Sequence, residues 1–257
     1  MNTSYGILVT AGGTQEPIDS VRTITNTSTG KLGSIIADEC ASVFPTAKIF
    51  YICAQTAVRP TSTSVNCIPI QSTYDLQNAV AKVMSEEKID AVVHSMAVSD
   101  YTVASLCDVE TLAKKIKNSC KENECCVSKE TIVEHLLQND VRTGGKKVSS
   151  NVKHPLLLLT QTPKIISLFR KMSESAIIVG FKLLSGVSEN ELIDVAYNLL
   201  QKNGCNFVLA NDTQNISDKK HKAYLVDANK NIVHFETKTE IAKGIANAIS
   251  KALDAKH

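Results

Sequence analysis

The sequence contains no tryptophan, and aromatic residues make up only 5% of its 257 residues. Proteins that bind single-stranded nucleic acid stack the bases on aromatic side chains, so this scarcity argues against that class. An excess of charge of one sign is also missing, because 28 basic and 26 acidic residues give a net charge of +2. No broad field therefore attracts nucleic acid or an anionic membrane, and any anion must be bound locally.

Long apolar runs and metal-binding cysteine patterns are absent as well. The apolar runs, such as Leu156 to Leu159, are far too short to cross a bilayer. The eight cysteines show no CxxC spacing and have no histidine pair beside them, which argues against a zinc site. We therefore expect a soluble, cytoplasmic protein with reduced thiols, among which Cys120, Cys125 and Cys126 lie in a polar stretch where they can oxidise.

Five short apolar runs, rich in valine and isoleucine, are typical of buried strands. They are Tyr5 to Val9, Ala47 to Cys53, Ala91 to His94, Ala176 to Phe181 and Phe207 to Ala210. Helical periodicity marks most of the intervening segments, namely Lys31 to Val43, Tyr74 to Glu87, Pro163 to Met172 and Glu189 to Asn203. This alternation predicts an α/β fold, with a Rossmann-like, mostly parallel sheet covered by helices on both faces. We expect one domain over residues 1–257.

Two parts of the chain depart from this alternation. Residues Lys222 to Asp227 and Ile232 to Glu236 alternate about a turn, which predicts a hairpin. A last helix is expected from Thr237, because Thr237 and Glu240 have capping-box spacing. The polar stretch Leu106 to Thr143 predicts a helical insertion that ends near a two-glycine turn. A second projecting hairpin is expected after it, from Lys146 to Ser150 and from Pro155 to Thr160.

Glycines and hydroxyl groups follow the first predicted strand, where open parallel sheets bind their ligands. Gly12 and Gly13 allow positive φ and let backbone N–H groups approach a phosphate. Thr10 and Thr14 are expected to add hydroxyl donors. The structural alternative is a tight turn that binds nothing.

Two familiar nucleotide motifs do not fit this stretch. A dinucleotide fingerprint needs GxGxxG and an acidic residue after the second strand, but the glycines are adjacent and that strand ends in Cys53-Ala54-Gln55. A P-loop needs glycine and a hydroxyl residue where this chain has Thr25 and Leu32. We expect an anion instead at the positive end of the helix that begins near Lys31, directly after Ser28-Thr29-Gly30.

Residues Val9 to Gly33, VTAGGTQEPIDSVRTITNTSTGKLG, resemble the opening of the phosphopantothenate-cysteine ligases, also called phosphopantothenoylcysteine synthetases. The pattern of that family is approximately GGTxEPIDxVRxIxNxSxGKxG. The resemblance continues in family order through HSMAVSDY (94–101), KKVSS (146–150), TPKIISL (162–168), VGFKLL (179–184) and LANDTQNIS (209–217). It covers nearly the whole chain except the insertion at 106–143.

The resemblance implies a ligase that joins 4'-phosphopantothenate to L-cysteine in coenzyme A biosynthesis. In this family the carboxylate attacks a nucleoside triphosphate, which gives an acyl-nucleotide and pyrophosphate, and the cysteine amine then displaces the nucleoside monophosphate. The co-substrate implied is CTP, with ATP as the alternative, together with Mg2+. A homodimer is implied too, in which the second hairpin could cover a partner's site. Because the chain begins at its first strand, without the flavin domain of bifunctional relatives, no FMN is expected.

The resemblance also implies roles for individual residues. Asn26 matches the asparagine that holds the acyl-nucleotide, and Arg22 lies where its guanidinium can grip a carboxylate or phosphate. The structural alternatives are a turn residue for Asn26 and a surface ion pair with Asp19 for Arg22. Lys147, or else its neighbour Lys146, aligns with the first lysine of the family's KxKK loop, which neutralises charge on the triphosphate. A solvated hairpin charge is the alternative.

Asp100 matches a family aspartate near the triphosphate and the divalent cation, and its carboxylate suits Mg2+. It could instead cap a turn with Ser99. Phe181 either contacts the nucleotide or packs in the core, and His94 is predicted to be a hydrogen-bonded core histidine without a catalytic role. The predicted nucleotide-binding residues are Gly12, Gly13, Thr14, Ser28, Gly30, Lys31, Asp100, Phe181, Asn211 and Asp212.

Two other functions stay open at this point. The sheet and its glycines also fit a nicotinamide-dependent oxidoreductase, although the acidic residue after the second strand is missing. A non-catalytic nucleotide-binding regulator would keep the fold without turnover. Binding of NADPH without triphosphate turnover would favour the first, and absence of any turnover would favour the second.

Overall fold

The computed structural model describes residues 4–122, 127–138, 147–217 and 220–256. By its internal contacts the chain divides into two compact units. Unit 1 contains residues 1–14, 27–98 and 164–257, and unit 2 contains residues 15–26 and 99–163. Because each unit is assembled from separate stretches of the chain, neither corresponds to a simple N- or C-terminal half. The expectation of one ligase domain over residues 1–257 stays a prediction.

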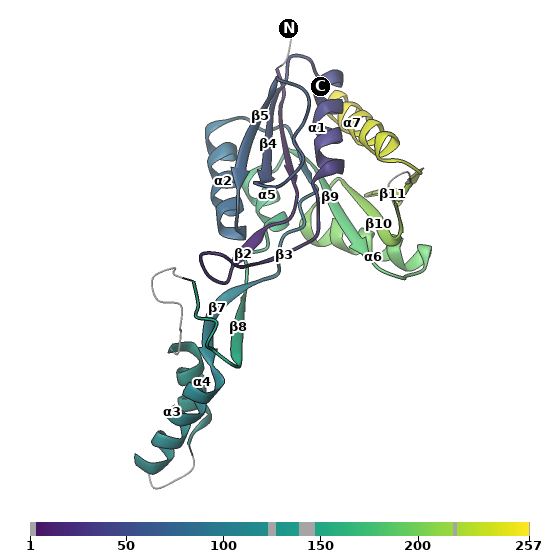
Figure 1. Cartoon of the computed structure of the whole chain (residues 1–257). Helices are drawn as coiled ribbons and strands as arrows, with labels where there is room; N and C mark the ends of the chain where they lie inside the picture. The colour runs from purple at the N-terminus through teal and green to yellow at the C-terminus, as the bar shows by residue number, and fades with distance from the viewer. Residues whose placement is uncertain (1–3, 123–126, 139–146, 218–219, 257) are drawn as a thin grey trace. The chain divides into compact units, whose positions relative to one another are not determined.

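The described residues of unit 1 form an eight-stranded sheet with the order β12-β11-β10-β9-β6-β1-β4-β5 (Figure 1). Neighbouring strands from β5 to β10 pair in parallel, and β10, β11 and β12 pair antiparallel at one edge. The predicted Rossmann-like, mostly parallel sheet is therefore confirmed. The strands are β1 (Gly6–Ala11), β4 (Lys48–Ala54), β5 (Val65–Ile70), β6 (Ala91–His94), β9 (Ile177–Leu184), β10 (Phe207–Ile216), β11 (His221–Asp227) and β12 (Ile232–Phe235).

Helices cover both faces of this sheet because successive side chains of its strands point to opposite sides. In β1, Ile7 and Val9 belong to one buried cluster and Leu8 to another. The first cluster contains residues of α1 (Lys31–Val43) and α7 (Lys238–Asp254). The second contains residues of the helices on the other face, which are α2 (Thr73–Glu86), α5 (Ile166–Met172) and α6 (Glu189–Asn203). Because these strands are buried on both faces, their sequences are continuous apolar runs.

Most sequence predictions for unit 1 are confirmed within a few residues, including the hairpin of β11 and β12. The capping box is present, since the Thr237 side chain accepts a hydrogen bond from the backbone N–H of Glu240. Strand β5 was missed because Asn66 and Pro69 interrupt its apolar pattern. Proline is tolerated there because β5 lies at the edge of the sheet. None of the described helices is long and apolar enough to cross a membrane.

The described residues of unit 2 form two antiparallel strand pairs and two helices. Strand β2 (Gln15–Pro17) pairs with β3 (Thr23–Thr25), and β7 (Tyr101–Asp108) pairs with β8 (Pro155–Gln161). Two helices, α3 (Val109–Glu122) and α4 (Lys129–Gln138), follow β7. The prediction of a helical insertion is thus confirmed for these residues, although its first three positions belong to β7.

The prediction of the second hairpin is wrong about the partner strand. Strand β8 lies where expected, but it pairs with β7, and residues 147–150 form no strand. The pattern of β7 is hidden by polar residues and by a register shift between Val103 and Ser105. The glycine turn at Gly144-Gly145, together with Lys146, Cys125 and Cys126, lies outside the described residues.

Candidate functional site

Two glycine turns of unit 1 meet just beyond the end of β1. Gly12 has a φ of +88° and Gly30 a φ of +74°, values that favour glycine. A Cβ atom on Gly30 would lie 3.2 Å from the backbone nitrogen of Gly12. Side chains on Gly12 and Gly30 would also meet Ala57, with Cβ–Cβ distances of 2.8 and 2.9 Å. Backbone conformation and close packing therefore both require glycine at these two positions.

Helix α1 begins directly after Gly30. Its N-cap residue, Gly30, has no side chain to cap it, and its first turn contains no acidic residue. The N-termini of α2, α6 and α7 are instead capped by Ser72, Ser188 and Thr237. Exposed Ser28 and Lys31 flank the start of α1. Its first N–H groups and the positive end of its dipole suit an anion, as the sequence predicts.

The two threonines beside these glycines are turned into the protein. Thr10 is fully buried, and its Oγ1 lies 2.7 Å from Nδ1 of His94, so the expectation that it donates to a phosphate is wrong. Thr14 is fully buried as well and accepts a hydrogen bond of 3.3 Å from the hydroxyl of Thr73. Its backbone N–H donates to the carbonyl of Ala97. The nucleotide-binding role of Thr14 stays a prediction.

His94 is a core residue, as its sequence context predicts. It is 6% exposed, and its ring meets Phe169 edge-on at a centroid distance of 5.0 Å. Burial lowers the pKa of His94 to about 4, so the imidazole is neutral at pH 7. The prediction of a hydrogen-bonded core histidine is confirmed, and the prediction that His94 has no catalytic role stays a prediction.

The remaining predicted nucleotide residues of unit 1 lie on or beside its strands. Gly13 forms an isolated parallel bridge with Ala97, and Phe181 packs against the cluster that contains α1 and α7. The side-chain nitrogen of Asn211 lies 2.8 Å from Nε2 of His221, and both residues are buried. Core packing, the alternative considered for Phe181, is therefore present.

Asp212 is a buried residue of β10 that pairs with Leu184 of β9. Its carboxylate accepts hydrogen bonds from the backbone N–H groups of Val187, at 3.0 Å, and Gln214, at 2.8 Å. These bonds hold the pKa of Asp212 below its usual value. Base recognition by Asn211 and Asp212 stays a prediction.

A buried carboxylate organises the part of unit 2 that contains Arg22. The side chain of Asp19 is fully buried, whereas that of Arg22 is 51% exposed. Oδ1 of Asp19 accepts the backbone N–H groups of Val21 and Arg22, each at 2.9 Å. Oδ2 accepts Nε and Nη2 of Arg22, at 3.0 and 2.5 Å. The bonds from Arg22 hold the pKa of Asp19 well below its usual range, against the opposing effect of burial.

The same ion pair holds a distant segment of unit 2. The backbone N–H of Val148 donates to Oδ2 of Asp19 at 3.0 Å, and Nη2 of Arg22 donates to the carbonyl of Val148 at 3.3 Å. Val148 is buried, and the preceding Lys147 is exposed. Arg22 and Val148 are 126 residues apart in the sequence. The structure therefore brings the predicted carboxylate-binding arginine and the predicted loop lysine onto neighbouring backbone segments.

Asn26 directly follows β3 and Asp100 directly precedes β7 in unit 2, and both are exposed. The carbonyl of Asn26 accepts the hydroxyl of Thr25. The turn at Asp100 is held by Thr162, whose backbone N–H donates to the Asp100 carbonyl at 3.1 Å. Among the described residues, no group of three or more His, Cys, Asp or Glu side chains could hold a metal ion. A single exposed carboxylate still fits Mg2+ that is bound mainly through phosphates and water.

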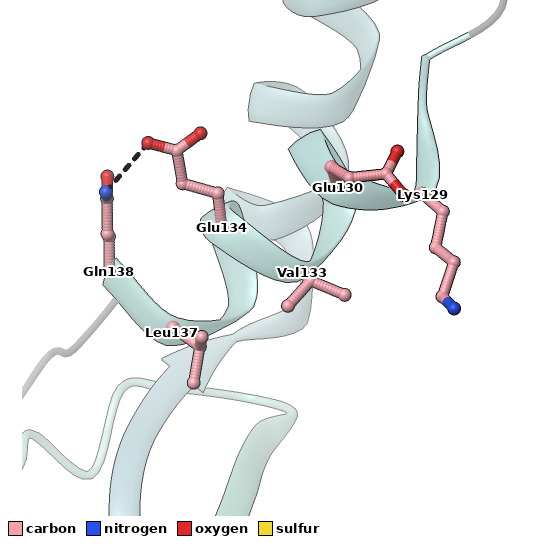
Figure 2. A pocket seen from close by; sticks show the side chains of 6 residues that line it. All are labelled: Lys129, Glu130, Val133, Glu134, Leu137 and Gln138. Carbon is pink, nitrogen blue, oxygen red and sulfur yellow. Dashed lines mark hydrogen bonds between the residues drawn. The ribbon is translucent and has the colours of Figure 1, made fainter.

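One surface hollow of unit 2 lies away from all these residues. A pocket of about 370 Å³ lies along α4, where Figure 2 shows Val133 and Leu137 one turn apart beside Glu134 and Gln138. Nε2 of Gln138 donates to Glu134 at 2.9 Å. The lining comes from one helix, and none of the predicted site residues contributes to it.

Sequence reasoning missed the role of Asp19, which it considered only as a surface partner of Arg22. An aspartate side chain often accepts the backbone N–H groups of the residues two and three positions later, which forms a turn. The sequence Asp19-Ser20-Val21-Arg22 has this spacing. The isolated apolar Val148 in a polar stretch was a second signal of local burial. Neither signal shows that the two segments contact each other.

A mostly parallel α/β sheet, with glycine turns and an uncapped helix beyond its central strand, places the chain in the Rossmann-like class. Its sequence matches the family described as DNA/pantothenate metabolism flavoprotein C-terminal domain over residues 3–140 and 109–253. The chain belongs to this family. The family resemblance seen in the sequence motifs is thereby confirmed.

Individual relatives agree with this assignment. A coenzyme A biosynthesis bifunctional protein CoaBC from Thermococcus kodakarensis is 31% identical over 250 residues, which are 96% of this chain and 51% of that protein. The chain spans about half the length of the curated relatives it matches over most of its length. A crystal structure of the DNA/pantothenate metabolism flavoprotein from Streptococcus pneumoniae is 33% identical, with a TM-score of 0.77 over 99% of this chain and 100% of that chain.

A more distant structure shares the fold. It is a Cab2 mutant in complex with phosphopantothenate-cysteine, with 15% identity and a TM-score of 0.65 over 98% of this chain and 88% of that chain. At this level of identity the likeness concerns the fold alone.

Proposed function

We propose that this chain catalyses the ligation of 4'-phosphopantothenate to L-cysteine in coenzyme A biosynthesis. The observation that carries the proposal is the family match, which runs through the segments of both units that contain the predicted site residues. The name of the Thermococcus relative points to the same pathway. The contact of the Arg22 and Val148 segments adds a structural reason to expect joint action of Arg22 and Lys147.

The proposed reaction has two steps. An oxygen of the phosphopantothenate carboxylate attacks the α-phosphorus of a nucleoside triphosphate, and the bond to the β-phosphate oxygen breaks to release pyrophosphate. The amine of cysteine then attacks the acyl carbon, loses a proton and expels the nucleoside monophosphate. No enzyme nucleophile is needed, so positioning and charge stabilisation suffice.

The chain's own residues supply fixed donors and charges for these steps. The N–H groups at the glycine turn and at the start of α1 bind phosphate, and exposed Arg22 binds a carboxylate or phosphate. Exposed Lys147 neutralises charge that grows on the leaving pyrophosphate, and Asn26 hydrogen-bonds the acyl-nucleotide. Asp100 would hold Mg2+, which supplies charge neutralisation for the triphosphate. CTP is the proposed nucleotide, and a homodimer is the proposed assembly.

Pyrophosphate release tests the proposal directly. Purified protein is given Mg2+ and 4'-phosphopantothenate, with CTP and ATP in separate assays, and L-cysteine is present or absent. We expect release that requires phosphopantothenate and is faster with CTP, and formation of phosphopantothenoylcysteine only when cysteine is added. Absence of release with either nucleotide would overturn the ligase proposal. NADPH binding under those conditions would then favour the oxidoreductase.

The proposed role of Lys147 has a matched control in the same segment. Lys147→Gln should lower kcat for pyrophosphate release by about 100-fold, because one preorganised charge at a developing anion has effects of that order. Lys153 is exposed six residues later, and Lys153→Gln should leave kcat near the wild-type value. Equal effects of the two substitutions would contradict the specific role of Lys147.

A further inference from the structure

Asp19 has no direct part in the proposed chemistry, yet it joins the two segments that carry Arg22 and Lys147. We infer that Asp19 is a positioning residue, which holds the Lys147 segment beside the Arg22 turn through its Oδ2 atom. The expected effect of Asp19 on catalysis rests on the proposed function. The anchor itself rests on contacts within unit 2 alone.

The two carboxylate oxygens of Asp19 have separate tasks. Oδ1 accepts the backbone N–H groups of Val21 and Arg22, which shapes the local turn. Oδ2 accepts Nε and Nη2 of Arg22 and the backbone N–H of Val148. A charged carboxylate is the group that can accept all these bonds, and hydrogen bonds to charged groups are stronger than neutral ones. The turn therefore needs Oδ1, whereas the contact with Val148 needs Oδ2.

The Lys147 segment is attached to this carboxylate at one residue. Among the described residues from 147 to 151, Val148 alone is buried, and its neighbours Lys147 and Ser149 are exposed. Both backbone polar groups of Val148 bond to the ion pair, the N–H to Asp19 and the carbonyl to Arg22. No strand pairing fixes residues 147–150. Loss of the Asp19 charge should therefore loosen Lys147 more than it loosens the rest of unit 2.

Substitution of Asp19 by asparagine separates the two tasks. The amide of the new side chain would keep one oxygen for the local turn but would present an N–H2 group to three donors at the position of Oδ2. The amide exchange rate of Val148, measured by NMR, should rise by about 10- to 100-fold in Asp19→Asn, because its acceptor is lost. The amides of Val21 and Arg22 should change less. An unchanged exchange rate at Val148 in folded Asp19→Asn protein would overturn the anchor.

Asp227 provides the matched control in unit 1. Its Oδ1 accepts the backbone N–H groups of Asn229 and Asn231, both at 2.8 Å, in the turn between β11 and β12. Asp227→Asn should leave exchange at Val148 and pyrophosphate release unchanged. If Asp19→Asn does not fold, Asp19→Glu serves instead, since it keeps the charge but displaces the acceptor. Faster exchange at Val148 in Asp19→Glu is then the expected result, and wild-type exchange would overturn the anchor.

A double-mutant cycle tests whether Asp19 acts through Lys147. Asp19→Asn should lower kcat for pyrophosphate release by about tenfold or more, because displacement of a charged group such as Lys147 from the reacting atoms slows the chemical step by factors of this order. In the Lys147→Gln background the same change should have little further effect. Fully additive losses would overturn action through Lys147. If the wild-type protein releases no pyrophosphate, the proposed function fails, and the exchange rates still decide whether Asp19 anchors Val148.

Discussion

The predicted site residues of the two units differ in burial and in their contacts. In unit 1 the predicted residues are mostly buried, and their backbone and side chains are engaged in the sheet, as with Thr14 and Asp212. In unit 2 the predicted residues Arg22, Asn26 and Lys147 are exposed on short strands and turns. The difference teaches that substitutions of the candidate residues in unit 1 should affect the stability of the fold more than substitutions of the exposed residues in unit 2.

The largest expected effect concerns the glycine turn of unit 1. Gly12→Ala should lower the free energy of unfolding by about 2–4 kcal/mol, because it combines an unfavourable φ with a contact of 2.8 Å to Ala57. Gly186 has a φ of +71°, but an added Cβ would meet only the flexible side chain of Gln214. Gly186→Ala should therefore cost about 1 kcal/mol. Urea unfolding checks both, and equal costs would show that crowding at Gly12 is unimportant.

The next effect is the pH dependence caused by His94. Its folded pKa of about 4 lies below the unfolded value near 6.5, so the unfolded state binds a proton first as pH falls. The stabilisation is fully present above pH 6.5 and is lost as pH falls to about 4. The loss is up to about 3 kcal/mol, or about 1.4 kcal/mol per unit of pKa difference.

Urea unfolding at several pH values measures this dependence. His94→Asn should reduce the slope between pH 6.5 and 4, and the remaining slope should come partly from His221, whose pKa burial also lowers to about 4. A wild-type slope in His94→Asn would mean that His94 titrates normally in the folded protein.

A smaller effect is expected at the capped helix of unit 1. Thr237→Ala removes the acceptor for the backbone N–H of Glu240 at the start of α7 and should cost about 1 kcal/mol in thermal or urea unfolding. Thr29→Ala, at the uncapped start of α1, should cost less than half as much, since only a long contact of 3.4 Å to Lys31 is lost. Similar costs would remove the contrast between the capped and uncapped helices.

The smallest stability effect is expected in unit 2, where the proposed effect on activity is large. Lys147→Gln should change the free energy of unfolding by less than about 0.5 kcal/mol, because its side chain is exposed. Urea unfolding of this variant beside Gly12→Ala compares the two units directly. A loss above about 1 kcal/mol would mean that Lys147 is a structural residue, and the contrast between the units would then fail.

Local patterns were enough to predict most of unit 1. Strands such as β1 and β6 are apolar on both faces, so each appears in the sequence as a continuous apolar run. The capping-box spacing of Thr237 and Glu240 predicts the start of α7. Prediction failed where context overrides the pattern. Pro69 is acceptable only because β5 is an edge strand, and β7 is recognisable only beside its partner β8.

The candidate site was predictable as a set of residues, through the family motifs, but its arrangement was not. The motifs identify Gly12, Gly30, Arg22 and Lys147 without showing which of them contact each other. They also could not show that the Thr10 hydroxyl bonds to His94, because that bond joins two neighbouring strands of the sheet.

The sequence by itself determined the alternating strands and helices, the positions of the glycine turns and the membership of a family. These follow from periodicity and motifs, which are local properties of the chain. Only the tertiary structure decided that Asp19 accepts the N–H of Val148, 129 residues away, and that Thr10 is turned inward. Such contacts depend on the path of the chain between distant segments, and burial then decides which polar groups can reach a ligand.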